Sequence, residues 1–138
     1  MNEQAILNEQ TPPIDPALLS FGIGVFQAAM AGELQTSVEV GPGDELAHMG
    51  IHAIQHEIEG HGLSEREEIS LMFRVLAFPR LLEDAAGDTR THSHVQEMGH
   101  GYVVSEEFLR AASRCDLRAE SSGAFRYDID SLIRQLTH

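Results

Sequence analysis

The sequence contains no lysine, and this absence defines its electrostatics. All nine basic residues are arginines, against 22 aspartates and glutamates, so the formal net charge at pH 7 is −13. Such a charge repels phosphate backbones and anionic headgroups, which argues against binding to nucleic acid or to an anionic membrane surface. It suits a protein whose partner is basic, either a protein surface or a cation.

Cysteine and recognisable catalytic motifs are also scarce. The lone Cys115 has no second cysteine with which to form an internal disulfide, as is typical of a reducing compartment. The first ten residues, MNEQAILNEQ, hold neither a positive charge nor an apolar run, so no secretory signal is visible. There is no glycine-rich phosphate loop, serine nucleophile elbow or paired-cysteine motif. We therefore expect a cytoplasmic protein and favour a non-enzymatic one.

Length and composition predict one domain. With 138 residues, 42 % of them hydrophobic, the chain can bury a core without metal or disulfides. Residues 1–15 are polar and proline-rich, so we predict a flexible N-terminal lead-in there and a single globular helical domain over residues 16–138. The predicted fold class is mainly α, a compact domain of five or six helices with at most a small two- or three-stranded sheet. An α+β fold is the alternative.

The most apolar segment, residues 16–34, predicts a buried core helix. Asp15 is the expected N-cap and Pro16 the first helical residue. Small residues recur every four positions along one flank of this helix, namely Ser20, Gly24, Ala28 and Gly32. Such a flank allows another helix to approach closely. We favour intramolecular packing there, and a homodimer interface through the same flank is the alternative.

A second core helix is predicted to begin at Ser64. Ser64-Glu65-Arg66-Glu67 has the sequence of a capping box. The main buried face is expected to comprise Ile69, Met72, Phe73 and Leu76, widened by Leu71, Val75 and Phe78. Pro79 is expected to kink or interrupt this helix, which should end near Gly87.

The C-terminal third predicts short elements. Ser93 is expected to cap a short helix, and Tyr102–Val104 to form a short strand. Ser105 has the position of an N-cap before a further helix. Residues 125–129 alternate between apolar and polar side chains, which predicts a strand, and Asp130 is the expected cap of a final helix.

The most distinctive stretch is residues 44–62, DELAHMGIHAIQHEIEGHG. Its histidines His48, His52 and His56 are four residues apart, so on a helix they form one stripe. The apolar face of the same helix is formed by different residues, Ala47, Ile51, Ile54 and Ile58. The stripe is therefore expected to project outward from the core, unless another element covers it.

Histidine is the commonest metal ligand in proteins, so the stripe supports a metal-binding hypothesis. The candidate ions are zinc, nickel, cobalt, copper and iron, and the candidate ligands are Glu45, His48, His52, His56, His94, Glu97 and His100. Residues 45–48 and 97–100 share the Glu-x-x-His spacing of di-iron bundles, but the first pair faces outward and the second lies among glycines. A buried di-iron site is therefore not expected. A pH sensor and a simply solvated polar face remain as alternatives.

Two function classes follow. The preferred one is a small acidic non-enzymatic protein that binds a basic macromolecular partner, as an inhibitor, immunity protein, adaptor or chaperone would. Residues 33–68 carry nine acidic residues and one arginine, and the candidate contacts are Glu45, Glu57, Glu59, Glu65, Glu67 and Glu68. The alternative is a transition-metal enzyme, carrier or sensor. Cys115 is expected to be a buried or incidental thiol rather than a nucleophile.

Overall fold

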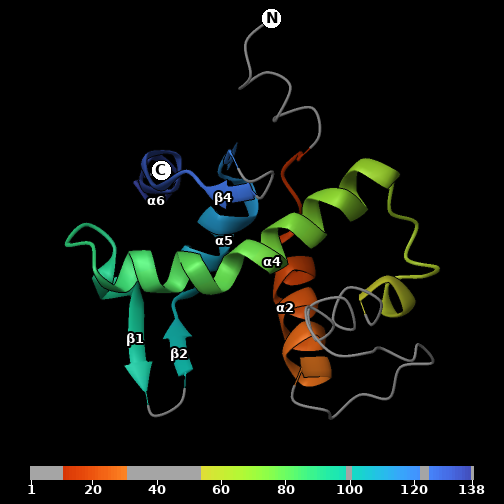
Figure 1. The fold of residues 1–138 in the computed structure, drawn as a ribbon, viewed down its shortest axis with the longest axis horizontal. Coiled ribbons are helices and arrows are strands. Elements are labelled where there is room, and N and C mark those ends of the chain that lie inside the picture. Colours follow the sequence, from red (N-terminus) through yellow and green to blue (C-terminus); the bar gives the residue numbers. More distant parts are fainter. Residues whose placement is uncertain (1–10, 31–53, 99–100, 122–124, 138) are drawn as a thin grey trace, which may run out of the picture.

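A long helix, α4, crosses the molecule, and the other described elements pack around it (Figure 1). The computed structural model describes residues 11–30, 54–98, 101–121 and 125–137. In chain order the elements are α2 (Pro16–Met30), α4 (Glu65–Ala86), the 3₁₀ turn η1 (His92–His94), β1 (Val95–Met98), β2 (Gly101–Val104), α5 (Glu106–Arg114), β3 (Leu117–Ala119), β4 (Phe125–Tyr127) and α6 (Ile129–Leu136).

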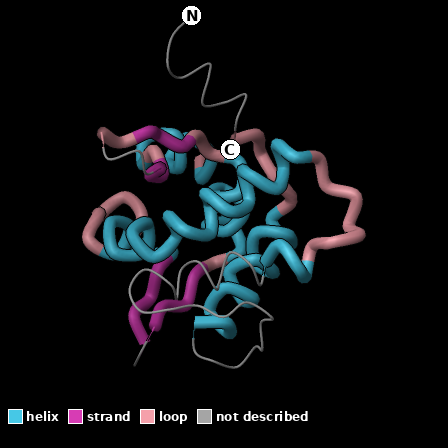
Figure 2. Tube along the Cα trace, turned by 45° about the vertical axis from the view of Figure 1, so that its right-hand side comes forward, coloured by secondary structure: helices cyan, strands magenta, loops and turns pink. Residues whose placement is uncertain are grey.

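The mainly-α fold class is confirmed. The described residues contain four α-helices and a helical turn over residues 54–57. The small sheet content takes the form of two separate antiparallel hairpins, β1–β2 and β3–β4. In the first hairpin Val95 lies opposite Val104, and in the second Leu117 lies opposite Tyr127. The hairpins lie on opposite sides of α4 (Figures 1 and 2).

Three of the predicted helix starts are confirmed by their capping bonds. Asp15 Oδ1 accepts a hydrogen bond from the backbone N–H of Ala17 at 2.8 Å, and α2 begins at Pro16. Ser64 caps α4 as one half of a complete capping box with Glu67. Ser105 Oγ accepts from the backbone N–H of the third residue of α5 at 3.1 Å. Each bond satisfies a backbone donor that has no partner within its helix.

Two local predictions for the C-terminal third are wrong. The short helix expected after Ser93 is a 3₁₀ turn followed by β1, because residues 95–98 pair with β2 instead of with one another. The final helix is capped by Asp128 and not by Asp130, because Asp128 Oδ1 accepts from the backbone N–H groups of Asp130 and Ser131. The strand predicted over residues 125–129 accordingly ends at Tyr127.

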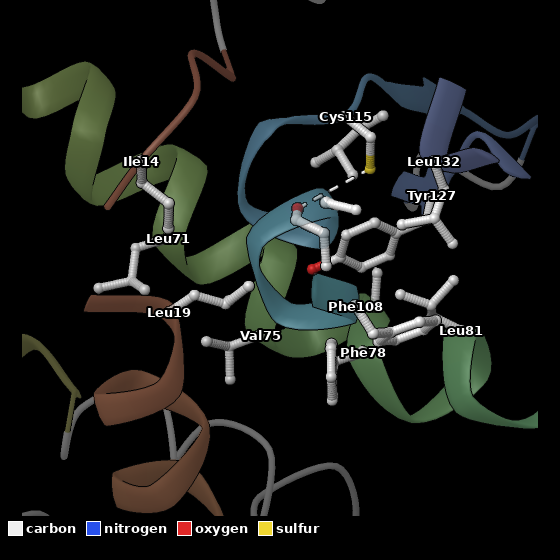
Figure 3. Packing of buried hydrophobic residues seen from close by; sticks show 14 of the residues in the cluster. Ile14, Leu19, Leu71, Val75, Phe78, Leu81, Phe108, Cys115, Tyr127 and Leu132 are labelled. Carbon is white, nitrogen blue, oxygen red and sulfur yellow. Dashed lines mark hydrogen bonds between the residues drawn. The ribbon is translucent and has the colours of Figure 1, made fainter. Parts of the chain in front are cut away.

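The buried face of α4 also differs from the predicted one. Leu71, Val75 and Phe78 are buried, whereas Ile69 and Leu76 remain 37 % and 38 % exposed. The predicted main face is thus divided, since Ile69 and Leu76 lie on the outer side of the helix whereas Phe73 packs against the core and contacts the ring of Phe125. The side that was expected only to widen it points into the core, where Phe78 lies edge-on to Phe108 and Tyr127 (Figure 3).

Pro79 does not interrupt α4, which is continuous from Glu65 to Ala86. Figure 1 shows that the helix bends along its length. Proline removes one helical hydrogen bond, and its ring crowds the preceding turn, so a bend is the usual outcome when the flanking turns are held by packing. Here the packing comes from Phe78 and Leu81, both buried on either side of the proline.

Arg74 is completely buried in the middle of α4. Its Nη1 donates to the carbonyl oxygens of Ala112 and Cys115 at 2.7 and 2.8 Å, and its Nη2 donates to that of Thr11 at 3.1 Å. Its Nε donates to Ser70 Oγ at 3.0 Å. The guanidinium therefore joins three segments that are distant in sequence.

The segment before α2 packs against this network. Ser70 Oγ donates to the carbonyl oxygen of Pro12 at 2.6 Å, and the backbone N–H of Ile14 donates to that of Ser113 at 2.9 Å. Ile14 is buried with the core (Figure 3). Thr11 and Ile14, before the start of α2, are thus both part of the packed structure. The division into a lead-in over residues 1–15 and a domain over residues 16–138 stays a prediction, since residues 1–10 lie outside the described residues.

Candidate functional site

The acidic segment, residues 56–68, leads from the helical turn at 54–57 into α4. Two buried isoleucines anchor its start, with Ile54 and Ile58 only 1 % and 2 % exposed. Gly60 and Gly62 then turn the chain, with φ of +88° and +73°, in a region that other residues rarely adopt. The helical turn over residues 54–57 accordingly ends before these glycines. Figure 1 shows the segment in yellow, beside the start of α4 and at the far end of that helix from the β1–β2 hairpin.

The carboxylates of this segment have no arginine partner among the described residues. Glu57, Glu59 and Glu65 are exposed and Glu68 is half-buried. Ion pairs occur instead around the C-terminal half of α4, where Arg80 and Arg126 bind Asp84 and Arg90 binds Asp88 and Asp130. The described ion pairs therefore neutralise Asp84, Asp88 and Asp130 near the C-terminal end of α4, whereas none neutralises the carboxylates of the acidic segment at its N-terminal end.

Glu67 differs from its neighbours because its carboxylate accepts a hydrogen bond within the capping box of α4. Its Oε1 accepts from the backbone N–H of Ser64 at 3.1 Å, and the N–H of Glu67 donates to Ser64 Oγ at 3.2 Å. This carboxylate stabilises the first turn of α4, where negative charge also interacts well with the helix dipole. Of the predicted partner contacts that the structure describes, Glu67 is thus the one with a structural role. Glu45 lies outside the described residues.

The metal candidates are only partly described. Glu45, His48, His52 and His100 lie outside the described residues, and His56 and Glu97 are exposed. His94 is half-buried, and its Nδ1 forms a 2.7 Å hydrogen bond with the Ser105 hydroxyl at the start of α5. Within the described part of the chain, no three histidine, cysteine, aspartate or glutamate side chains converge as a metal site would require. The metal hypothesis stays a prediction.

Cys115 is buried at the end of α5, as expected. Burial raises the pKa of its thiol from 9.0 to about 12, although the nearby Arg74 guanidinium acts in the opposite direction. A cysteine nucleophile needs an accessible thiol with a lowered pKa. This thiol therefore fills the core and does not act as a nucleophile at neutral pH.

An apolar pocket of about 510 Å³ lies between α2, α4, β2 and α5. Its described lining includes Ser20 and Gly24 of α2, Phe78 and Leu82 of α4, and Tyr102 of β2. A Cβ atom at Gly24 would meet nothing within 4 Å. The described half of the small-residue flank therefore borders this pocket. The spacing of Ser20 and Gly24 was its only signal in the sequence, since the other walls come from distant segments.

The small-residue flank predicted a close helix contact, but no described residue approaches Gly24, and the close contact lies at Gly22, two residues earlier and on nearly the opposite side of α2. At Gly22, an added Cβ atom would lie 2.9 Å from Leu71 Cδ1 and 3.1 Å from Val75 Cγ2. This glycine allows α2 to pack closely against α4. Intramolecular packing of α2 is thus observed, through Gly22. Gly32 and the side chain of Ala28 lie outside the described residues, and the homodimer alternative stays a prediction.

No protein-family model, characterised protein or solved structure matches this chain. Among the described helices, none combines the length and the apolar character needed to cross a membrane.

Proposed function

We propose that this chain is a small non-enzymatic cytoplasmic protein that binds a basic macromolecular partner through its acidic segment. The observation that carries the proposal is the run of carboxylates at Glu57, Glu59, Glu65 and Glu68, which have no cationic partner in the described part of the chain. Complementary charge across an interface accelerates association and fixes the partner's orientation.

The construction of the segment supports this function. Its start is anchored in the core by Ile54 and Ile58, and its end is fixed by the capping box of α4. A surface held at both ends loses less conformational entropy on binding than a free loop does. The net charge of −13 attracts a basic partner from beyond contact distance and repels acidic proteins that would compete with it.

The test compares two variants of equal charge. The first replaces Glu57, Glu59, Glu65 and Glu68 with glutamine, and the second replaces Glu97, Glu106, Glu107 and Glu120, all exposed elsewhere on the molecule. Each is immobilised beside the wild type and exposed to extract from the native host. We expect a basic protein to bind the wild type and the second variant, to be lost from the first, and to elute as the salt concentration rises.

Two results would overturn the proposal. If the basic protein bound both variants equally weakly, net charge alone would account for its binding. If the wild type retained no basic protein, there would be no evidence for a partner. Elemental analysis of untagged protein purified without chelator tests the competing class. Near-stoichiometric zinc, nickel, cobalt, copper or iron, abolished by His52→Ala with His56→Ala, would assign the chain to the metal-binding class instead.

A further inference from the structure

The apolar pocket between α2 and α4 has the size and lining of a small-molecule site. Its volume of about 510 Å³ lies within the range of about 300 to 1,000 Å³ that is usual for ligand pockets. Its apolar walls include Phe26, Phe78 and Leu82, and its four bounding elements, three helices and one strand, all contribute side chains to the core. Such a site holds a ligand mainly by burying apolar surface.

The shape of the pocket depends on a glycine that α2 does not otherwise need. Glycine inside a helix lowers the stability of the helix more than any other residue except proline. At Gly22 the reason for it is close contact with α4, but at Gly24 an added Cβ atom would meet no neighbour. The missing side chain at Gly24 leaves room within the pocket wall, and this room is available to a bound molecule.

The polar groups that line the pocket favour a ligand with a cationic head group. Glu83 is the charged residue among its described lining, and no ion pair reaches the Glu83 carboxylate from the described residues. Tyr102 adds an aromatic ring, whose face attracts cations, especially quaternary ammonium groups. No arginine or histidine is among the described lining residues, so an anionic head group would lack a counter-charge.

We propose that this pocket binds a small cationic amphiphile, with its apolar chain between α2 and α4 and its amine or quaternary ammonium group beside Glu83 and Tyr102. This site is separate from the acidic segment, which ends in the first turn of α4 and supplies none of the described lining residues of the pocket. The inference therefore does not rest on the proposed partner binding.

Calorimetric titration with decyltrimethylammonium, kept below its micelle concentration, tests the proposal on the full chain. Decyl sulfate, which has the same ten-carbon alkyl chain and the opposite charge, serves as the control ligand. We expect saturable binding of one decyltrimethylammonium per chain and at least tenfold weaker binding of decyl sulfate. Gly24→Leu should weaken decyltrimethylammonium binding at least tenfold, because the new side chain extends into the pocket from its wall.

Three variants separate the pocket from general attraction to an acidic protein. Gly24→Leu keeps the net charge and raises helix propensity, so its melting temperature should equal or exceed that of the wild type. Glu83→Gln should weaken binding at least threefold, whereas Glu120→Gln, an equal charge change outside the pocket, should leave it unchanged. Unaltered affinity in Gly24→Leu, equal weakening by both glutamine variants, or equal affinity for decyl sulfate would overturn the proposal.

Discussion

The guanidinium of Arg74 donates a 2.8 Å hydrogen bond to the backbone carbonyl oxygen of Cys115, the residue that caps the C-terminal end of α5. A second bond reaches Ala112 in the last turn of that helix. The last carbonyls of a helix lack partners within it and carry partial negative charge. The end of α5 therefore supplies acceptors to a buried cation that has no carboxylate partner among the described residues.

Replacing Arg74 should destabilise the protein severely. Arg74→Met removes the guanidinium donor from the carbonyl oxygens of Thr11, Ala112 and Cys115, and we expect a loss of roughly 3–5 kcal/mol in the free energy of unfolding. Urea denaturation followed by circular dichroism measures it. The control is Arg66→Met, at an exposed position of the same helix, which should change the free energy by less than about 0.5 kcal/mol. Similar losses in the two variants would contradict the role of the network.

Two glycines of α2 should respond in opposite directions to alanine. At Gly24 the new methyl group meets nothing, so Gly24→Ala should raise the unfolding free energy by about 0.5–1 kcal/mol through helix propensity. At Gly22 the methyl group would lie 2.9 Å from Leu71 Cδ1, and overpacking of this kind costs about 1–3 kcal/mol. Gly22→Ala should therefore lower the melting temperature. Stabilisation by both substitutions would show that α2 does not contact α4 closely at Gly22.

The Cys115 thiol should be protected from modification until the protein unfolds. It is 1 % exposed, and burial raises its pKa to about 12. A thiol-specific disulfide reagent at pH 8 should react with native protein only at the rate of opening and within seconds in denaturing urea. Because the pKa is raised above 9.0 in the folded state, the associated stability is present below pH 9 and is lost as the pH rises toward 12. Rapid stoichiometric reaction of native protein would contradict this assignment.

Asp88 should titrate at unusually low pH. The side chain of Arg90 is the main cause, followed by its backbone N–H, and together they lower the pKa of the Asp88 carboxyl from 3.8 to about 2. The lowered pKa means that this contribution to stability is present above pH 3.8 and is lost as the pH falls toward 2. Carboxyl NMR titration measures it directly. Arg90→Gln should return the pKa part of the way, since the backbone donor remains, while Arg80→Gln should leave it unchanged.

Local sequence signals predicted the helix starts well. The capping box at Ser64 and the caps at Asp15 and Ser105 each depend on bonds within about three residues, so the sequence alone contains the information. At the final helix the same rule selected Asp130, whereas the observed cap is Asp128, two residues earlier. Asp128 is the cap because Leu117 pairs with Tyr127, which keeps the preceding residues extended, and that pairing is not visible locally.

Long-range packing accounts for the larger errors. Both sides of α4 carry apolar residues, and the most deeply buried side also contains the polar Ser70 and Arg74, whose burial apolar periodicity does not predict. Both become buried only because Pro12, Ala112 and Cys115 bring carbonyl acceptors from distant segments. β1 was missed for a related reason, since its strand forms by pairing with β2. The acidic segment was predicted from composition, whereas the pocket needed the arrangement of four separate elements.

The Arg74 network also constrains the order in which the chain can fold. Its bonds span 63 residues toward Thr11 and 41 residues toward Cys115. During synthesis α4 is made before α5. Until α5 has been made, the Arg74 guanidinium lacks the carbonyl acceptors of Ala112 and Cys115 and must stay hydrated. We therefore expect the side of α4 around Arg74 to stay hydrated until the end of α5 docks. Helices that form early can pack fully around Arg74 only after α5 has docked. We therefore expect the core to form late and in one cooperative event.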